Sequence, residues 1–347
     1  MTITIYGAGA IGGCVGAYIA RAGETVQFVD RMADHVAAIN ATGLKISGFD
    51  DFTVSARACM PAELRGPLEI VFLAVKSQDT ADALGVISPL VGPDTVVVSL
   101  QNGMNEHVIA ARIGAEHVIA AFVSLAADWQ VPGHIEHGAA GNIWVGELDG
   151  RITQRLMNIQ RLLKHAVTAH TTENIFGYLW TKQIDSSLMF AQAVTDETYF
   201  DLYGNARYQP ALIALVAEGV DLAHDAGVRL EVFDDFEAIK MWPRTAAEEP
   251  EARAALNRFA DVFRTRLKVR SGPWRDLAVR KRPTEVDHMV GWLVAEGHRR
   301  GFAVPLNERL LQQVKEIEKG VRARGLHNID ELENLRRQVY GDRTGSS

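Results

Sequence analysis

The feature that most constrains the fold of this chain is a cluster of glycines between its first two regular segments. Residues Thr2–Tyr6 form a short β-rich run, and the sequence Gly7-Ala8-Gly9-Ala10-Ile11-Gly12 follows it directly. That sequence opens a stretch of helix-compatible composition, Ala10–Ala22, and Thr25–Val29 is strand-like again. We therefore expect a βαβ unit whose strand-to-helix turn is made of glycines.

Each of the three spaced glycines has a separate physical role in this setting. Gly7 permits the tight turn, Gly9 lets a ligand approach the backbone, and Gly12 allows the helix to pack closely. The amino end of the helix adds N–H donors and the positive end of its dipole. We interpret the turn as the pyrophosphate site of a nicotinamide dinucleotide, formed by Gly7, Ala8, Gly9, Ala10, Ile11 and Gly12. The alternative is a glycine-rich turn that binds nothing.

The end of the second strand carries two neighbouring residues that point to different cofactors. Asp30 lies about twenty residues beyond the glycines, where a carboxylate accepts hydrogen bonds from the adenosine ribose of NAD. Arg31 follows it, and a guanidinium matches the oxygens of the 2′-phosphate of NADP. A carboxylate beside a 2′-phosphate is repulsive, so Asp30 favours NAD, whereas an outward-turned Asp30 leaves NADP open.

The alternation of strand and helix continues to about residue 173 and then stops. Further strand candidates in the first half are Leu68–Val75, Thr95–Leu100, Val118–Leu125 and Asn142–Val145. Long helical candidates in the second half are Asn174–Glu197, Pro210–Ala226, Ala252–Val269 and Thr284–Gly301. These patterns predict an α/β fold: an N-terminal Rossmann-type doubly wound sheet (residues 1–173) followed by an all-helical C-terminal domain (174–342). Residues 343–347 are expected to be a disordered tail.

Composition and charge argue against several classes of protein. A formal net charge of -7 opposes binding to a nucleic-acid backbone. The two cysteines, Cys14 and Cys59, are too few for a disulfide framework, and no apolar run approaches the ~18 residues of a membrane-spanning helix. The amino terminus shows no signal peptide. No metal site is expected, because His134, His137 and His288 have no partner at ligand spacing. We expect a cytoplasmic protein that binds neither nucleic acid nor membrane.

The sequence contains three further motifs in addition to the glycine turn. They are Val71-Phe72-Leu73-Ala74-Val75-Lys76, then Ser99-Leu100-Gln101-Asn102-Gly103, and Leu179-Trp180-Thr181-Lys182 with Arg282-Pro283-Thr284-Glu285-Val286-Asp287. From Met1 to about Lys319 the chain thereby resembles the ketopantoate reductase (2-dehydropantoate 2-reductase) family. The resemblance implies a Rossmann domain followed by a helical domain. It also implies an oxidoreductase of pantothenate biosynthesis, in which NADPH reduces a 2-keto acid.

Lys76 and Asn102 each lie just past the carboxyl end of a predicted strand. Open α/β sheets bind ligands at that edge, so both residues are expected to face the cofactor. The resemblance implies that Lys76 contacts the cofactor and that Asn102 holds the nicotinamide ribose and a substrate hydroxyl or carboxylate. A solvated lysine and a turn-forming Asn-Gly pair are the alternatives.

The resemblance assigns the chemistry to the second half of the chain. It implies that Lys182 is the general acid, which protonates the carbonyl oxygen of the substrate as hydride reaches the carbon. An ammonium is suited to this because it donates a proton and offsets the developing alkoxide charge. Glu285 matches the family's acidic residue and is expected to orient the substrate and the lysine, a role that Asp287 is able to share. A solvated lysine and a helix-capping glutamate are the alternatives.

One departure from the family leaves the identity of the substrate open. The family's lysine is commonly followed four and eight residues later by asparagines that line the substrate pocket, whereas this chain has Ser186 and Phe190. Residues four apart share a helical face, so these side chains are expected to reshape the wall beside Lys182. Ser271 stands where the family places a serine that contacts the substrate carboxylate, and Arg275 is a further candidate for that anion.

These residues together predict an enzyme that transfers hydride between NAD(P)H and a small anionic 2-keto or 2-hydroxy acid. A catabolic NAD-dependent dehydrogenase of a different hydroxy acid is the alternative within the same class, favoured by Asp30, Ser186 and Phe190. A nonenzymatic sensor that binds a dinucleotide is the alternative from another class. Apolar helical faces in the second half predict a homodimer.

Overall fold

The computed structural model describes residues 1–264 and 269–341, and the chain divides into two compact units. Unit 1 comprises Met1–Ile175, and unit 2 comprises Phe176–Ser347. This division lies two residues beyond the predicted boundary at residue 173. The predicted tail, 343–347, lies outside the described residues.

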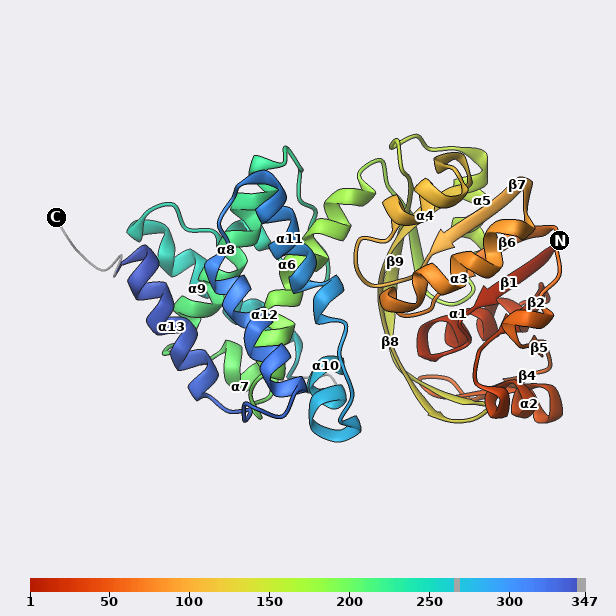
Figure 1. The fold of residues 1–347 in the computed structure, drawn as a ribbon, viewed down its shortest axis with the longest axis horizontal. Coiled ribbons are helices and arrows are strands. Elements are labelled where there is room, and N and C mark those ends of the chain that lie inside the picture. The colour runs from red at the N-terminus through yellow and green to blue at the C-terminus, as the bar shows by residue number, and fades with distance from the viewer. Residues whose placement is uncertain (265–268, 342–347) are drawn as a thin grey trace. The chain divides into compact units, whose positions relative to one another are not determined.

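Unit 1 is built on one sheet. Its strands are β1 (Thr2–Tyr6), β2 (Thr25–Val29), β3 (Leu44–Gly48), β4 (Phe52–Val54), β5 (Arg57–Cys59), β6 (Leu68–Leu73), β7 (Val91–Ser99), β8 (Val118–Val131), β9 (His134–Glu147) and β10 (Thr168–Thr171). They lie in the order β4-β3-β9-β8-β7-β6-β1-β2-β5, and β10 pairs with β9. Figure 1 shows this sheet and labels its strands other than β3 and β10. Among the strand pairs of the described residues, only β3–β4 and β8–β9 are antiparallel.

The strands β5-β2-β1-β6-β7-β8 form an uninterrupted run of parallel pairs in the sheet. Their order is that of a Rossmann fold, with the first strand of the chain in the interior and the winding reversed between β1 and β6. Sheets of this kind bind ligands outside the carboxyl ends of the strands at the point of reversal. The predicted Rossmann-type fold is confirmed, and its switch point is the carboxyl edge of β1 and β6.

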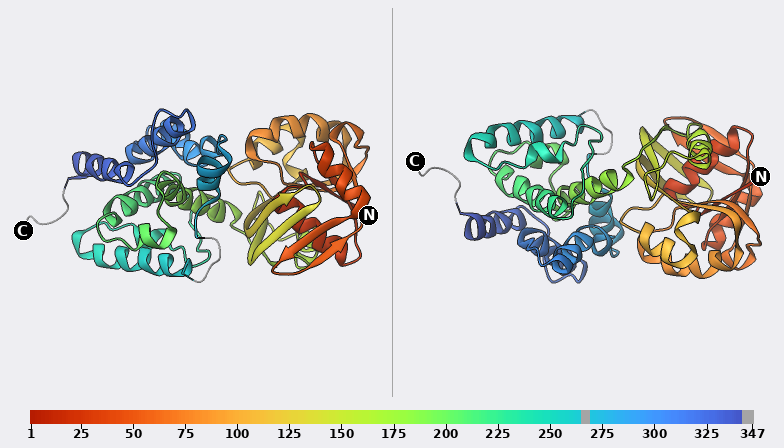
Figure 2. Two further views of the ribbon diagram at one scale, coloured as in Figure 1. Left: turned by 90° about the horizontal axis from the view of Figure 1, so that it is seen from below. Right: turned by 90° about the horizontal axis from the view of Figure 1, so that it is seen from above.

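Helices cover both faces of this sheet (Figure 2). One face carries α1 (Ala10–Arg21), α2 (Ala33–Thr42) and α5 (Gln154–Leu163), and the other carries α3 (Thr80–Ile87) and α4 (Glu106–Ile113). Strand β6 shows why two separate cores result: Phe72 belongs to the first, whereas Val71 and Leu73 belong to the second. Successive strand residues point to opposite faces, and both faces of this strand are apolar because helices bury both.

The strand predictions locate the parallel core but miss the short strands. β3, β4, β5 and β10 were not predicted, and the last three have only three or four residues, so that they offer few alternating positions to detect. β8 and β9 are each 14 residues long, which extends them well beyond the predicted Val118–Leu125 and Asn142–Val145. They are longer because they pair with each other as an antiparallel hairpin.

Unit 2 consists of helices, as predicted. They are α6 (Ile175–Ala193), α7 (Tyr199–Tyr203), α8 (Gln209–Asp225), α9 (Glu249–Val262), α10 (Gly272–Arg275), α11 (Val290–Arg300), α12 (Pro305–Glu318) and α13 (His327–Tyr340). α12 packs against α8, α11 and α13 (Figure 1). α6 and α8 approach closely at Gly219, where a Cβ would lie 2.8 Å from the side chain of Ile184. Within the described parts of the chain, no helix combines the length and apolar character needed to cross a membrane.

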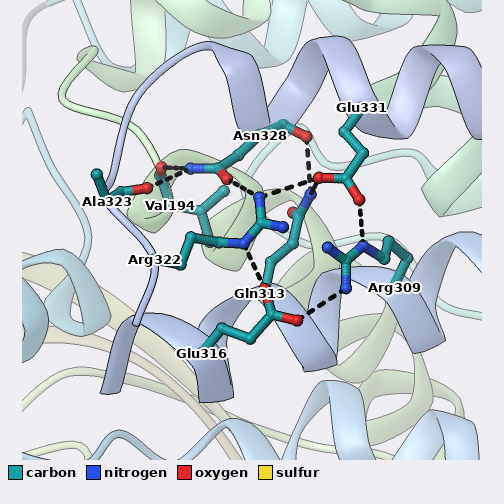
Figure 3. Close-up of polar contacts among 8 residues, drawn as sticks. All are labelled: Val194, Arg309, Gln313, Glu316, Arg322, Ala323, Asn328 and Glu331. Atoms are coloured by element: carbon teal, nitrogen blue, oxygen red, sulfur yellow. Dashed lines mark hydrogen bonds and ion pairs between the residues drawn. The ribbon is translucent and has the colours of Figure 1, made fainter. Parts of the chain in front are cut away.

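Four side chains from α12, α13 and the turn between them form a closed ring of alternating charge, which we call the charged ring (Figure 3). Arg309 is paired with Glu316 at 3.1 Å and with Glu331 at 2.5 Å. Arg322 is paired with the same two glutamates, at 2.9 Å in the case of Glu331. The two arginines are each 18% exposed, whereas Glu316 and Glu331 are 25% and 39% exposed, so the ring is only partly withdrawn from solvent.

Asn328 connects the charged ring to the end of α6 (Figure 3). Its side chain is fully buried and accepts a hydrogen bond from Arg322 at 2.7 Å. Its amide nitrogen donates to the carbonyl oxygens of Val194 at 2.8 Å and Ala323 at 3.1 Å. Val194 directly follows α6, so the carbonyl group just past the end of that helix accepts hydrogen bonds from Asn328 in the first turn of α13 and from the N–H of Gly325, which precedes α13.

Candidate active site

The glycine turn leaves no room for side chains at two of its three spaced glycines. Gly7 has a φ of +101°, and a Cβ there would lie 2.8 Å from the backbone carbon of Ala74. At Gly12 a Cβ would lie 2.1 Å from the carbonyl oxygen of Gly7. Gly9 differs, because a Cβ there would meet nothing within 4 Å. The turn is therefore packed tightly on both sides of a position that is open to an approaching ligand.

The amino end of α1 offers its N–H groups without a competing side chain. The N-cap is Gly9, which has no side chain to bond the N–H groups of the first turn, and that turn contains no acidic residue. Such an end attracts anions through its N–H donors and its dipole. Together with the open position at Gly9, it fits the pyrophosphate of a dinucleotide.

The ends of the parallel strands bring the other predicted cofactor residues to the same edge as this turn. The strand ends stand in one row, as the ladder pairs show: Tyr6↔Val29, Tyr6↔Leu73 and Leu73↔Ser99. Asp30, Lys76 and Asn102 follow β2, β6 and β7 by one to three residues. The glycine turn, Asp30, Lys76 and Asn102 therefore lie at the same edge of the sheet, although Gly7 and Asn102 are about 95 residues apart in the sequence.

Asp30 and Arg31 make different contacts at this edge. Asp30 is half-buried, and its Oδ1 accepts a hydrogen bond from the N–H of Met32 at 2.9 Å. Arg31 is exposed, and its Nη1 lies 2.9 Å from Oδ1 of Asp79. Arg31, the candidate ligand of the 2′-phosphate, is therefore paired with the carboxylate of Asp79, although solvent weakens an exposed pair of this kind.

A hydrogen-bond network joins the two loops that follow β6 and β7, and most of its members escaped the sequence analysis. Ser77 Oγ donates to the carbonyl oxygen of Asn102, and Asn105 Nδ2 donates to that same oxygen at 2.7 Å. Gln101 Nε2 donates to Thr80 Oγ1 at 2.8 Å. The four side chains of this network are all buried, which fixes the backbone at Asn102. Gln101 lies within the motif noted around Asn102, whereas the other three have no sequence signal beyond a position after a strand.

Lys182 lies on α6 and is half-buried. Trp180, two residues before Lys182, packs edge-to-face against Trp292 of α11, with ring centroids 4.9 Å apart. Thr181, directly before Lys182, has its Oγ1 2.8 Å from the carbonyl oxygen of Glu231. Because the residues on its amino-terminal side are anchored to two other parts of unit 2, α6 holds Lys182 at a defined position.

Glu285 belongs to the segment Thr284–Asp287, which we call the acidic segment. Glu285 is half-buried and precedes a short 3-10 turn, Val286–His288, and α11 starts only after that turn. The predicted α-helix beginning at Thr284 is wrong here, since the segment is not α-helical. Asp287 accepts a hydrogen bond from Lys315 Nζ at 2.6 Å. That engagement argues against Asp287 as a substitute for Glu285.

Three residues expected to contact the substrate have no accessible surface in this structure. Ser186, Phe190 and Ser271 are each 0% exposed. Ser186 Oγ donates to the carbonyl oxygen of Gln183 at 2.6 Å, and Ser271 Oγ caps α10 by accepting from the N–H of Trp274 at 3.0 Å. These side chains lie behind the surface of unit 2 and support it from beneath.

Among residues 1–264 and 269–341, no group of three His, Cys, Asp or Glu side chains is arranged to hold a metal ion. His137, one of the histidines considered above, has Nδ1 2.8 Å from the hydroxyl of Tyr18 and Nε2 3.0 Å from the carbonyl oxygen of Ala139. Burial lowers the pKa of His137 below its ordinary value. It is a neutral, hydrogen-bonded residue of unit 1 at physiological pH.

Comparison with known proteins adds independent information on both units. The family model of ketopantoate reductase PanE/ApbA matches residues 3–150, and the model of the C-terminal part of that family matches residues 174–318. A 2-dehydropantoate 2-reductase of Archaeoglobus fulgidus is 27% identical over 322 residues, which cover 92% of this chain and 98% of the relative. One from Mesorhizobium japonicum is 29% identical over 257 residues, covering 67% and 78%.

Solved structures share the fold. A PanE/ApbA family ketopantoate reductase from Ralstonia eutropha JMP134 matches with a TM-score of 0.78 and 28% identity, covering 92% of this chain and 99% of the other. D-mandelate dehydrogenase in complex with NADH and anilino(oxo)acetate matches with a TM-score of 0.79 and 21% identity, covering 93% and 100%. The second likeness is one of fold alone.

Proposed function

The chain belongs to the ketopantoate reductase family, and on that premise we propose that it reduces a small 2-keto acid, with 2-dehydropantoate the first candidate. It is an oxidoreductase that uses a nicotinamide dinucleotide. The observation that carries the proposal is the sheet edge of unit 1, where the glycine turn, Asp30, Lys76 and Asn102 stand together. That edge is where a Rossmann sheet binds its cofactor.

The residues at this edge have separate roles in the proposal. The glycine turn would hold the pyrophosphate, because Gly9 is open and the first turn of α1 is free of acidic residues. Asp30 would accept hydrogen bonds from the adenosine ribose. Asn102, whose backbone is fixed by the buried network, and Lys76 would face the nicotinamide half. The reduced nicotinamide supplies the hydride.

Lys182 is the proposed proton donor. Its Nζ would give a proton to the carbonyl oxygen of the substrate while the carbon accepts hydride, so that the keto acid becomes a hydroxy acid and the lysine becomes neutral. Before the transfer is complete, the ammonium also offsets the charge that develops on the oxygen. Glu285 would orient the ammonium and the substrate hydroxyl. The half-buried position of both side chains strengthens these interactions relative to bulk water.

The substrate carboxylate needs a cation, and Arg275 is the proposed one. Arg275 is half-buried, and burial together with the nearby Arg280 lowers its pKa. The negative charge of a carboxylate bound there would offset both effects, because a nearby opposite charge favours the charged guanidinium. Ser271 supports this arrangement as the N-cap of α10, whose last residue is Arg275. Ser186 and Phe190 would act indirectly, by shaping from beneath the wall that carries Lys182.

The substitution Lys182→Ala tests the proposal. We expect kcat to fall by about 10²- to 10⁴-fold, the usual contribution of a general acid, with the dinucleotide dissociation constant unchanged. Turnover is followed as oxidation of the reduced cofactor in the presence of 2-dehydropantoate, and affinity by fluorescence titration. Lys240→Ala is the matched control, because Lys240 is a lysine of unit 2 paired at the surface with Glu237 at 2.7 Å.

Each outcome of this experiment bears on the proposal. Full turnover by Lys182→Ala contradicts the role given to the lysine. A panel of 2-keto and 2-hydroxy acids, run in both directions, separates ketopantoate reduction from the oxidation of another hydroxy acid. Tight binding of the dinucleotide without turnover of any acid in the panel favours a sensor.

We further propose that NAD is preferred over NADP. Arg31 is paired with Asp79 and adjoins Asp30, so the local charge around a 2′-phosphate sums to about −1. We expect kcat/KM for NADH to exceed that for NADPH by at least about tenfold, the effect of ~1.4 kcal/mol. Asp79→Asn releases Arg31 and should improve the use of NADPH by about two- to fivefold, as expected for an exposed pair. Better use of NADPH than of NADH by the wild type overturns the assignment.

A further inference from the structure

Two side chains of α12 fix both ends of the acidic segment. Oε1 of Glu318 accepts hydrogen bonds from the N–H and the hydroxyl of Thr284, each at 2.7 Å. Oε2 of Glu318 lies 3.1 Å from Nζ of Lys315, which also donates to Asp287 at 2.6 Å. The last turns of α12 thus hold the segment on either side of Glu285.

The contacts between Glu318 and Thr284 are withdrawn from solvent, which makes them strong determinants of geometry, whereas the side chains of Lys315 and Asp287 are 36% and 55% exposed. The Glu318 side chain is 7% exposed, and Thr284 is 6% exposed. Burial alone would lower the pKa of Lys315, but its hydrogen bonds to Asp287 and Glu318 outweigh burial and leave that pKa raised. Lys315 is therefore charged at neutral pH. A buried carboxylate with a cation and two donors fixes the groups it bonds more firmly than an exposed one.

The other end of α12 is attached to the helix that carries Lys182. Asn307 is fully buried, and its Oδ1 accepts a hydrogen bond from Oγ of Ser187 at 2.6 Å. Its Nδ2 donates to Glu218 at 2.9 Å. Ser187 lies on α6, five residues after Lys182. A single 14-residue helix therefore contacts both the element that bears the proposed acid and the segment that bears Glu285.

We propose that Glu318 is a positioning residue for the reaction: through Thr284 it sets the backbone of the acidic segment and thereby the direction of the Glu285 carboxylate. This inference rests on the proposed function, in which Glu285 acts together with Lys182. Glu318 has no contact with the reacting atoms in this role. Its loss should lower kcat and leave the affinity for the dinucleotide unchanged, because that affinity belongs to unit 1.

Two variants of Glu318 separate its contacts. Glu318→Gln keeps an oxygen that can accept from Thr284 but loses the charge that faces Lys315, so kcat should fall about two- to fivefold. Glu318→Leu loses both contacts, and kcat should fall about 10- to 100-fold, as expected for a misplaced catalytic group. Thr284→Val removes the hydroxyl, which donates to Glu318 and accepts from the N–H of Val286, but it keeps the bond from its own N–H to Glu318, so its kcat should lie between those of the other two variants. If the leucine variant does not fold, as judged by its thermal unfolding, the other two carry the test.

Glu316→Gln is the matched control. Glu316 lies two residues before Glu318 on the same helix and is also paired with arginines, but it belongs to the charged ring (Figure 3). Its replacement should lower stability and leave kcat at the wild-type value. A fall in kcat equal to that of Glu318→Gln would mean that any damage to α12 reduces turnover, which overturns the inference.

A double-mutant cycle with Glu285 decides between a positioning role and a merely structural one. We expect Glu285→Gln alone to lower kcat at least about tenfold. If Glu318 acts through Glu285, adding Glu318→Leu to Glu285→Gln has no further effect on kcat. Additive losses overturn the inference while the proposed function stands. Full turnover by Glu285→Gln alone overturns the proposed role of Glu285 and the inference with it.

Discussion

The two units present their functional groups by different means. In unit 1 the proposed ligand contacts are largely backbone groups and residues at strand ends, whose places follow from the ladder of the sheet. In unit 2 the proposed groups are side chains on separate helices, and other side chains hold those helices together. The first arrangement depends on the absence of atoms at Gly7 and Gly12, whereas the second depends on the presence of polar partners.

This difference shows what kind of change each unit tolerates. A backbone that must approach another backbone closely has no substitute for glycine, because any Cβ collides with atoms that cannot move independently. A polar network has several members, so the loss of one contact weakens it without removing the fold. We therefore expect single substitutions to lower the stability of the fold strongly at Gly7 and Gly12, and to have smaller, graded effects on stability within the polar networks of unit 2.

The largest effect is expected for Gly12→Ala. The new Cβ would lie 2.1 Å from the carbonyl oxygen of Gly7 and 2.7 Å from Cβ of Ala74, so α1 has to move away from the sheet. We expect a loss of about 3 kcal/mol or more in the free energy of unfolding, measured by urea denaturation. Dinucleotide binding should be lost with it.

Two glycines without such neighbours serve as counterparts. Gly85→Ala, in α3, adds a Cβ that meets nothing within 4 Å and should leave unit 1 as stable or about 0.5–1 kcal/mol more stable. Gly9→Val should also retain the fold, because its position is open, but should weaken dinucleotide binding at least about tenfold. A stable Gly12→Ala variant that still binds the dinucleotide would break the contrast drawn between the units.

The same contrast explains how much the sequence revealed. The glycine turn and the strand-end positions of Asp30, Lys76 and Asn102 were predictable, because steric demands on a backbone leave local patterns in the sequence. The partners that fix Asn102, such as Ser77 and Asn105, were not. Each is a single polar residue in a loop, with no periodicity and no composition to mark it.

In unit 2 the sequence predicted helices in the regions of α6, α8, α9 and α11, but α7, α10, α12 and α13 were not among the predicted segments, and the connections between helices were not predictable. The bond between Thr284 and Glu318 spans 34 residues, and that between Ser187 and Asn307 spans 120. Residues so far apart share no local pattern, and hydrophobic periodicity reports only which face of a helix is buried. The resemblance to a family supplied Lys182 and Glu285, and it carried no information on Glu318, which no motif contains.

A smaller effect is expected when the charged ring of unit 2 is opened. Arg322→Met removes the cation shared by Glu316, Glu331 and Asn328. The free energy of unfolding should fall by about 1–2 kcal/mol, between the values for exposed and buried pairs, because the glutamates remain partly solvated. Turnover and dinucleotide binding should be unchanged. Arg299→Met is the control, since Arg299 is paired with Glu296 but is 64% exposed, and its loss should leave the free energy of unfolding nearly unchanged.

The pH dependence of this effect identifies its origin. The hydrogen bond from Arg322 lowers the pKa of Glu316, outweighing the opposite effect of burial. A carboxylate whose pKa is lower in the folded state stabilises the fold above its unfolded pKa, ordinarily 4.5, and loses that contribution as the pH falls through the lowered value. The unfolding curves of the wild type and Arg322→Met should therefore differ at pH 7 and converge in acid. If the difference in free energy of unfolding between the two proteins persists unchanged in acid, the methionine acts through packing and not through the lost charge. The stability of unit 2 would then depend on steric fit, as that of unit 1 does.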